Sequence, residues 1–147
     1  FLEGTYFWEG NPRHAQANNS EFDTNFRAAV GVDDRGASLA DSNDVSTYAH
    51  MFGCWETLNV IKAGMETSGY QGPADRQNLI EAVEAMTDMP HSDDHPQGAK
   101  LFNGKTHQVF GSQYISKVTD GNLVVEHTAS IEEGLYEDEV DYTTQSF

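Results

Sequence analysis

Residues 44–65, DVSTYAHMFGCWETLNVIKAGM, decide the fold, because they form the longest part of the chain with a helical spacing of apolar residues. Apolar side chains recur at steps of three and four, at Val45, Tyr48, Ala49, Phe52, Trp55, Leu58, Ile61 and Met65. One broad face of the predicted helix is therefore apolar and needs a partner. Ser42 or Asn43 is the expected N-cap, and Gly69 is the expected stop. A helix of about 22 residues spans roughly 33 Å, the width of a small domain.

The composition limits both the core and the partners. Of 147 residues, 37% are hydrophobic, so we expect one domain with a thin core. The formal net charge of −16 repels phosphate backbones and anionic membranes, and we expect no nucleic-acid partner. Residues 121–147 contain no Lys or Arg. This predicts a solvated and partly mobile acidic tail at 130–147.

Three further features limit the class of protein to which this chain can belong. Cys54 is the single cysteine, which rules out an internal disulfide, and its place on the central helix predicts a small apolar core residue. No apolar run approaches the ~18 residues of a membrane span. The chain opens with Phe1 and strand-like residues, so we expect a processed, truncated or excised piece.

The N-terminal part is predicted to form a strand, a short helix and a loop. Residues 1–8 are rich in aromatic and β-favouring side chains and lead into a Glu-Gly-Asn-Pro turn, which predicts a strand. A helix follows, with Asn19 or Ser20 as cap and Gly31 as stop. The apolar residues on its face are Phe22, Phe26 and Val30. Residues 32–43 lack periodicity, which predicts a loop.

The C-terminal half changes from helical to strand periodicity. Asp75 is the predicted N-cap of a third helix, which should pack against the central one. Its apolar stripe comprises Leu79, Ile80, Val83 and Met86. Residues 87–98 hold two prolines and no periodicity, which predicts a connector. Strands are predicted at 108–110, 113–118 and 123–127. The Asp-Gly step at 120–121 predicts a hairpin between the last two strands.

Five stretches carry a family resemblance through their order and their gaps. They are GTYFWEGNP (4–12), YAHMFGCWETLNVIKAGMETSG (48–69), DRQNLIEAVEAM (75–86), PQGAKLFNGKTHQ (96–108) and QYISKVTDGNLVV (113–125). In this order they resemble the C-terminal part of a type 1 periplasmic binding protein, the leucine/isoleucine/valine-binding family of ABC-transporter receptors. The resemblance covers nearly everything up to about Ala129. The acidic tail lies outside it.

The resemblance implies an α/β fold, as a portion of a two-lobed receptor in which each lobe is an open sheet flanked by helices. It makes residues 1–10 a strand and hinge crossing from the second lobe, and 11–98 the helical part of the first lobe. Residues 99–129 are then strands that return to the second lobe, and 130–147 are the acidic tail. This chain supplies parts of both lobes and completes neither.

The function implied is that of an extracytoplasmic solute-binding component of an ABC transporter. It captures an amino acid, branched-chain-like, or a related small polar organic molecule between two lobes and passes it to the permease subunits. No cofactor is implied, and the implied location is periplasmic or extracytoplasmic. The alternatives are an amino-acid-sensing regulatory module of the same fold, or a small acidic self-associating protein without ligand.

The helices also predict an exposed apolar surface. The chain has three amphipathic helices but only short local strands, so it cannot build a sheet with both faces buried under helices. The missing parallel strands should leave an apolar surface exposed. We therefore expect the chain to self-associate through this surface, or to exchange elements with another copy.

Four residues are the candidates for ligand contact: Tyr6, Trp8, Tyr48 and His50. Aromatic groups provide flat, rigid walls that close over an apolar or planar ligand, with a polar edge to orient it. The resemblance places Tyr48 and His50 near a cleft-lining position at the start of the central helix. It places Tyr6 and Trp8 near the hinge crossing. The alternative is that all four are ordinary core residues.

Metal binding and catalysis are the remaining hypotheses. The run His91-Ser92-Asp93-Asp94-His95 offers imidazoles and carboxylates of the kind that bind zinc. Two prolines bracket it and no third distant ligand stands at a recognised spacing, so we expect a solvated loop and no metal site. The chain has no G-x-S-x-G, P-loop, G-x-G-x-x-G or H-E-x-x-H motif, and Ser112 is isolated. We expect no enzyme activity.

Overall fold

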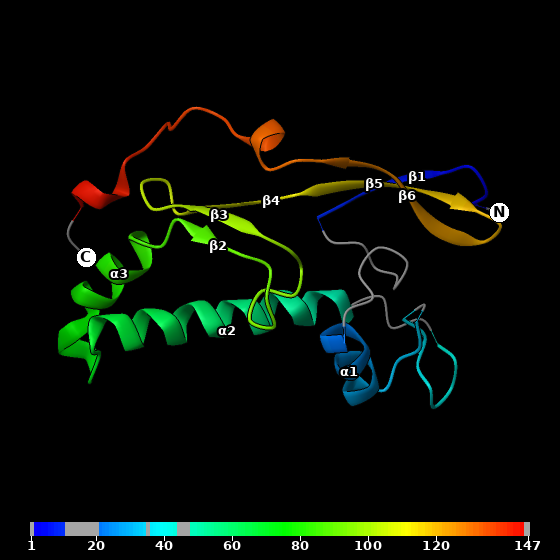
Figure 1. The fold of residues 1–147 in the computed structure, drawn as a ribbon, viewed down its shortest axis with the longest axis horizontal. Coiled ribbons are helices and arrows are strands. Elements are labelled where there is room, and N and C mark those ends of the chain that lie inside the picture. Colours follow the sequence, from blue (N-terminus) through cyan, green and yellow to red (C-terminus); the bar gives the residue numbers. More distant parts are fainter. Residues whose placement is uncertain (1, 11–20, 35, 44–47, 146–147) are drawn as a thin grey trace.

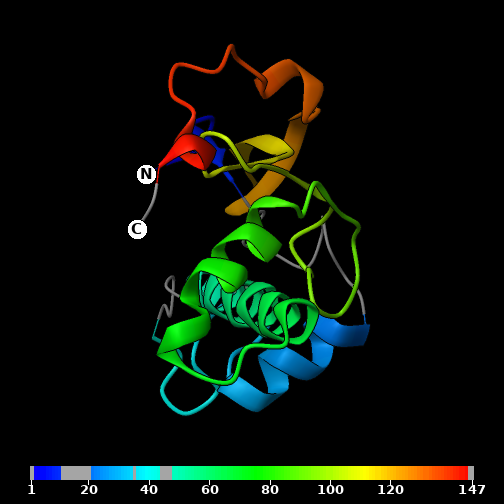
Figure 2. The same cartoon turned by 90° about the vertical axis from the view of Figure 1, so that its left-hand side faces the viewer.

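The computed structural model describes residues 2–10, 21–34, 36–43 and 48–145, without the side chains of residues 9 and 48–50. In this part the protein is mixed α/β, which confirms the expected class. The helices are α1 (Glu21–Val30), α2 (Tyr48–Ser68) and α3 (Arg76–Glu84). They lie in one layer, and two small antiparallel sheets lie in another (Figures 1 and 2).

Helix α1 packs its aromatic side chains against α2, as its apolar spacing predicts. The ring centroids of Phe26 and Phe52 are 4.6 Å apart, and those of Phe22 and Phe26 are 5.9 Å apart. The helix ends at Gly31, whose φ of 76° lies in the left-handed region that glycine adopts at least cost. The chain then brings Val32 back into the small core beside Phe52. The prediction of Gly31 as the stop is confirmed.

Helix α3 lies against α2 at a glycine. A Cβ atom on Gly64 would lie 2.7 Å from Cγ2 of Val83 and 3.1 Å from Cδ1 of Leu79, so only glycine lets the helices approach this closely. The predicted packing of these helices is confirmed. Asp75 is the N-cap residue of α3, as predicted, but its carboxylate accepts from the backbone N–H of Gln71 at 2.9 Å and makes no capping hydrogen bond to α3.

The first sheet has the strand order β1-β5-β6, from β1 (Tyr6–Glu9), β5 (Gln113–Thr119) and β6 (Asn122–Ala129). Asp120 and Gly121 join the last two strands with φ values of 51° and 73°. Positive φ at both central residues is the geometry that an Asp-Gly hairpin turn favours. The predicted hairpin is confirmed. The predicted strand at residues 1–8 is shorter than expected within the described residues.

The second sheet has the strand order β2-β3-β4, from β2 (Asp88–Met89), β3 (Lys100–Asn103) and β4 (Gln108–Gly111). The prediction that 87–98 is only a connector is wrong at its start, because β2 pairs with β3 and buries Met89. A strand of two residues is too short for an alternating pattern to reveal it.

The acidic tail contacts the second sheet and the turn between β3 and β4, whereas its partial mobility stays a prediction. The backbone N–H of Tyr142 donates to the carbonyl of Lys105 at 2.7 Å. The ring of Tyr136 meets Phe110 edge-on, with centroids 5.2 Å apart. Most carboxylates of the tail still face solvent. Backbone and aromatic contacts therefore hold a segment whose composition indicated only solvation.

The core is small for the length of the chain. Among the described residues, the buried hydrophobic side chains are Val32, Phe52 and Met89. The accessible surface is 9279 Å², whereas a folded monomer of 16.3 kDa exposes about 7,500 Å². Exposed large hydrophobic side chains on α2 and on both sheets contribute to this excess. The expectation of a thin core is confirmed.

Candidate functional site

Tyr6 and Trp8, two of the four predicted ligand-contact residues, lie side by side on one face of β1. They are two residues apart, so their side chains point to the same face of the sheet, where Lys117 and Ile115 are their partners on β5. This face is open: Trp8 is 73% exposed and Tyr6 is 56% exposed. The alternative that these two aromatics belong to a core is wrong for the described structure.

A cation sits beside these aromatic rings. Nζ of Lys117 lies 5.3 Å from the centroid of the Tyr6 ring and 3.7 Å from Oε1 of Glu126. The hydrogen bond with Tyr6 and the charge of Glu126 raise the pKa of Lys117 above its usual value. The exposed face therefore combines aromatic walls with an ammonium group, a pairing that suits a planar or anionic partner.

The other two predicted residues, Tyr48 and His50, begin helix α2, but their side chains lie outside the described residues. The structure therefore places their backbone only. It brings Tyr6 and Trp8 together, while the predicted grouping of all four residues stays a prediction.

Helix α2 presents an uncovered apolar stripe. Its members recur at alternating steps of three and four, so they share one face of the helix. They are Met51, Cys54, Leu58, Ile61 and Met65, and all are exposed. Leu58, at the centre of the stripe, is 65% exposed. The expectation that Cys54 is a core residue is wrong, because this side chain is exposed on α2.

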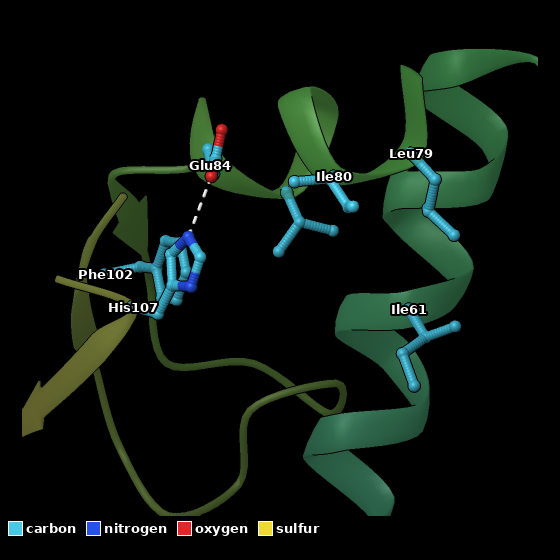
Figure 3. A pocket seen from close by; sticks show the side chains of 7 residues that line it. Ile61, Leu79, Ile80, Glu84, Phe102 and His107 are labelled. Carbon is cyan, nitrogen blue, oxygen red and sulfur yellow. Dashed lines mark hydrogen bonds and ion pairs between the residues drawn. The ribbon is translucent and has the colours of Figure 1, made fainter. Parts of the chain in front are cut away.

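An apolar pocket opens between α2, α3 and the second sheet (Figure 3). Its cavity measures about 310 Å³. The walls are aliphatic side chains of the two helices and an aromatic side chain of β3: Ile61, Leu79, Ile80, Val83 and Phe102. The sequence identified the residues of α3 as a packing stripe. It did not show that they would line an open cavity, because periodicity gives the face of a helix and not what covers it.

A hydrogen-bonded pair of side chains, Glu84 and His107, closes one side of this pocket. Nε2 of His107 lies 2.7 Å from Oε1 of Glu84, and the imidazole stacks on the ring of Tyr142 with centroids 5.1 Å apart. The turn that carries His107 is pressed against the end of α3. A Cβ atom on Gly104 would lie 2.1 Å from the carbonyl oxygen of Glu84. These contacts fix the turn between β3 and β4 on α3.

The Glu84–His107 pair joins α3 to the turn between β3 and β4, and within the described residues no nucleophile accompanies it. A carboxylate that orients an imidazole becomes catalytic when the imidazole reaches a nucleophile. Among the described residues, the side-chain partners of His107 are Glu84 and the Tyr142 ring, and neither is an activated hydroxyl or thiol. Sequence reasoning missed this pair because its members are 23 residues apart and no motif links them.

The histidine-rich loop is folded onto helix α2. No group of three or more His, Cys, Asp or Glu side chains in the described part of the chain has the arrangement to hold a metal ion. The loop instead folds on itself through a bridge between Ser92 and His95. It is fixed to α2, because Nε1 of Trp55 donates to the carbonyl of Asp93 at 2.8 Å. Ser112 links β4 and β5.

Comparisons with known proteins add no assignment. No family model, curated protein or solved structure matches this chain. Among the described residues, no helix has the length and apolar character to cross a membrane.

Proposed function

We propose that this chain is part of an extracytoplasmic solute-binding receptor that captures an amino acid, or a related small polar organic molecule, for an ABC transporter. The proposal rests on the sequence resemblance and on an arrangement that agrees with it. Among the described residues, the order of elements is β1, the helices α1 to α3, and then the strands β2 to β6, of which β5 and β6 form a C-terminal hairpin. On this proposal α2 and α3 clad the first lobe, and β5 and β6 belong to the second.

The uncovered stripe on α2 carries the proposal. Helices that flank an open α/β sheet bury such a stripe against the strands. Here α3 covers one flank of α2 at Gly64 and α1 covers another at Phe52, while Leu58 and its neighbours face solvent. A receptor lobe provides the missing sheet. Within the described residues the two sheets have three strands each, and every strand pair in them is antiparallel.

The side chains on the exposed face of β1 support the proposal that this strand lies near a ligand cleft. Tyr6 and Trp8 offer flat walls, and Lys117 offers a positive charge to a ligand carboxylate. Tyr48 and His50 are proposed as further contacts at the start of α2. Closure of two lobes over the ligand is then driven by contacts made only in the closed state.

The spacing of the stripe favours a second candidate, a small acidic protein that associates through α2. Steps of three and four residues are also the pattern of helices that pair along a seam. This candidate needs no ligand, so ligand binding separates the two functions.

The test is ligand binding by the product of the complete reading frame that encodes this sequence. The twenty amino acids and their amide derivatives are screened by thermal unfolding, and the best ligand is then followed by small-angle scattering. We expect a saturable rise of the melting midpoint and a smaller radius of gyration. Trp8→Ala should weaken binding, whereas Tyr136→Ala, which alters an exposed ring of the tail, should not. If no compound in the panel stabilises the protein, the proposed function is wrong.

A further inference from the structure

A second pocket lies between α1 and the N-terminal half of α2, where the loop after β2 closes it. Its cavity measures about 350 Å³, at the lower end of the range for small-molecule sites. Three aromatic side chains and three polar ones line it: Phe22, Phe26, Trp55, Glu21, Asn25 and Asp93. The pocket shares no residue with the face of β1 or with the cavity beside Glu84.

The aromatic walls are held in place by one another. The ring centroids of Phe22 and Trp55 are 5.7 Å apart, and Phe22 also stacks on Phe26. The indole N–H of Trp55 already donates to the backbone carbonyl of Asp93 at 2.8 Å. Because this bond uses the one donor of the indole and fixes the ring, the π-face is what Trp55 can offer to a ligand.

The charge of the pocket is negative. Glu21 and Asp93 bring two carboxylates, and no Lys or Arg is among the described residues that line the cavity. Arg27, the basic residue of α1, is ion-paired with the buried Asp23. The formal net charge of −16 adds a negative field around the whole chain.

We propose that this pocket binds a small organic ammonium, with the cation over the aromatic faces and its charge balanced by Glu21 and Asp93. Aromatic rings attract a desolvated ammonium through their negative faces, and quaternary or alkylated ammonium groups suit such walls better than a strongly hydrated metal ion does. Carboxylates at the rim strengthen the selection for positive charge. The inference does not depend on the receptor function, because it uses none of its proposed contact residues.

The test compares choline with 3,3-dimethylbutanol, a neutral compound of the same shape, by titration calorimetry of the 147-residue protein. We expect saturable binding of choline with an affinity at least about tenfold higher than that of the alcohol. Equal affinities for the two compounds, or binding of neither, would overturn the proposal.

Matched variants locate the site. Glu21→Gln with Asp93→Asn should weaken choline binding about tenfold, since it removes both rim charges. Glu137→Gln with Glu139→Gln makes the same change in net charge on the tail and should leave the affinity unchanged. All four carboxylates are exposed, so circular dichroism should show unchanged helix content. Equal weakening by both pairs would mean that choline responds to the overall charge, and it would refute the site.

Discussion

Glu56 ties the loop between β2 and β3 to helix α2. Its carboxylate is buried on α2, where Oε2 lies 3.1 Å from Nζ of Lys100 and Oε1 accepts from the backbone N–H of Gln97 at 2.8 Å. Together with the bond from Trp55 to Asp93, this pair ties a loop that has little secondary structure to the central helix.

Glu56→Leu should therefore lower the free energy of unfolding by about 3 kcal/mol, because it removes the carboxylate that balances the charge of the partly buried Lys100 and accepts from the backbone N–H of Gln97. The added substitution Lys100→Met should restore part of the loss, since it removes the orphaned charge. Chemical denaturation measures both effects. Glu126→Gln, at an exposed ion pair, is the control and should leave the midpoint unchanged. A Glu56→Leu protein as stable as the wild type would contradict the role of the pair.

At the residue scale, the most accurate predictions were those of helix stops and turns, where the backbone conformation requires one type of residue. Gly31, Gly69 and Gly121 all have positive φ at the expected stops or turn, because only the missing Cβ makes that conformation cheap. Asp75 was predicted less well, since its carboxylate serves the turn before the helix. Long-range pairs such as Glu84 with His107 could not be predicted, because they depend on how elements are placed in space.

At the element scale, the packing of α3 on α2 depends on a glycine within a helix. Glycine in a helix interior costs about 1 kcal/mol relative to alanine. Gly53 meets no atom within 4 Å of an added Cβ, whereas Gly64 faces Val83 at 2.7 Å. Substituting Gly53 therefore changes helix propensity alone, whereas substituting Gly64 changes both helix propensity and the packing of α3 on α2.

Gly53→Ala should raise the free energy of unfolding by about 0.5–1 kcal/mol. Gly64→Ala should lower it by about 1 kcal/mol, because the overpacking that it forces exceeds the gain in propensity. Both values come from denaturant unfolding monitored by circular dichroism. Stabilisation of equal size at the two positions would show that α3 does not lie against Gly64.

Helix existence and type could be predicted from periodicity, and the C-terminal ends of α1 and α2, at Val30 and Ser68, fall next to the expected stops. The predicted N-caps of α1 lie outside the described residues, and so does the chain that joins the predicted N-cap of α2 to this helix. What covers each helix could not be predicted. The apolar face of α2 predicts burial, yet only Phe52 from it is buried among the side chains that the structure describes. The candidate site shows the same limit. The sequence singled out Tyr6 and Trp8 as aromatics for ligand contact, but their open position on β1 required the sheet register.

At the scale of the whole molecule, the helices form one layer and the sheets another (Figures 1 and 2). Few buried hydrophobic side chains are found among the described residues, so no continuous core joins the two layers there. Exposed apolar side chains that share one face of a helix form a surface on which another structural element or another molecule can pack. On the proposed function that layer is the sheet of a receptor lobe. In the isolated chain the same stripe is free to meet a second copy.

Sedimentation velocity of the 147-residue protein over a range of concentrations tests this central claim most directly. We expect the wild-type sedimentation coefficient to rise with concentration, whereas the protein with Met51→Gln and Leu58→Gln on the stripe should sediment as a monomer. Leu39→Gln, at an exposed leucine outside the stripe, should behave as the wild type does. A wild-type protein that remains monomeric at every concentration would contradict the claim that α2 carries a face built to be covered.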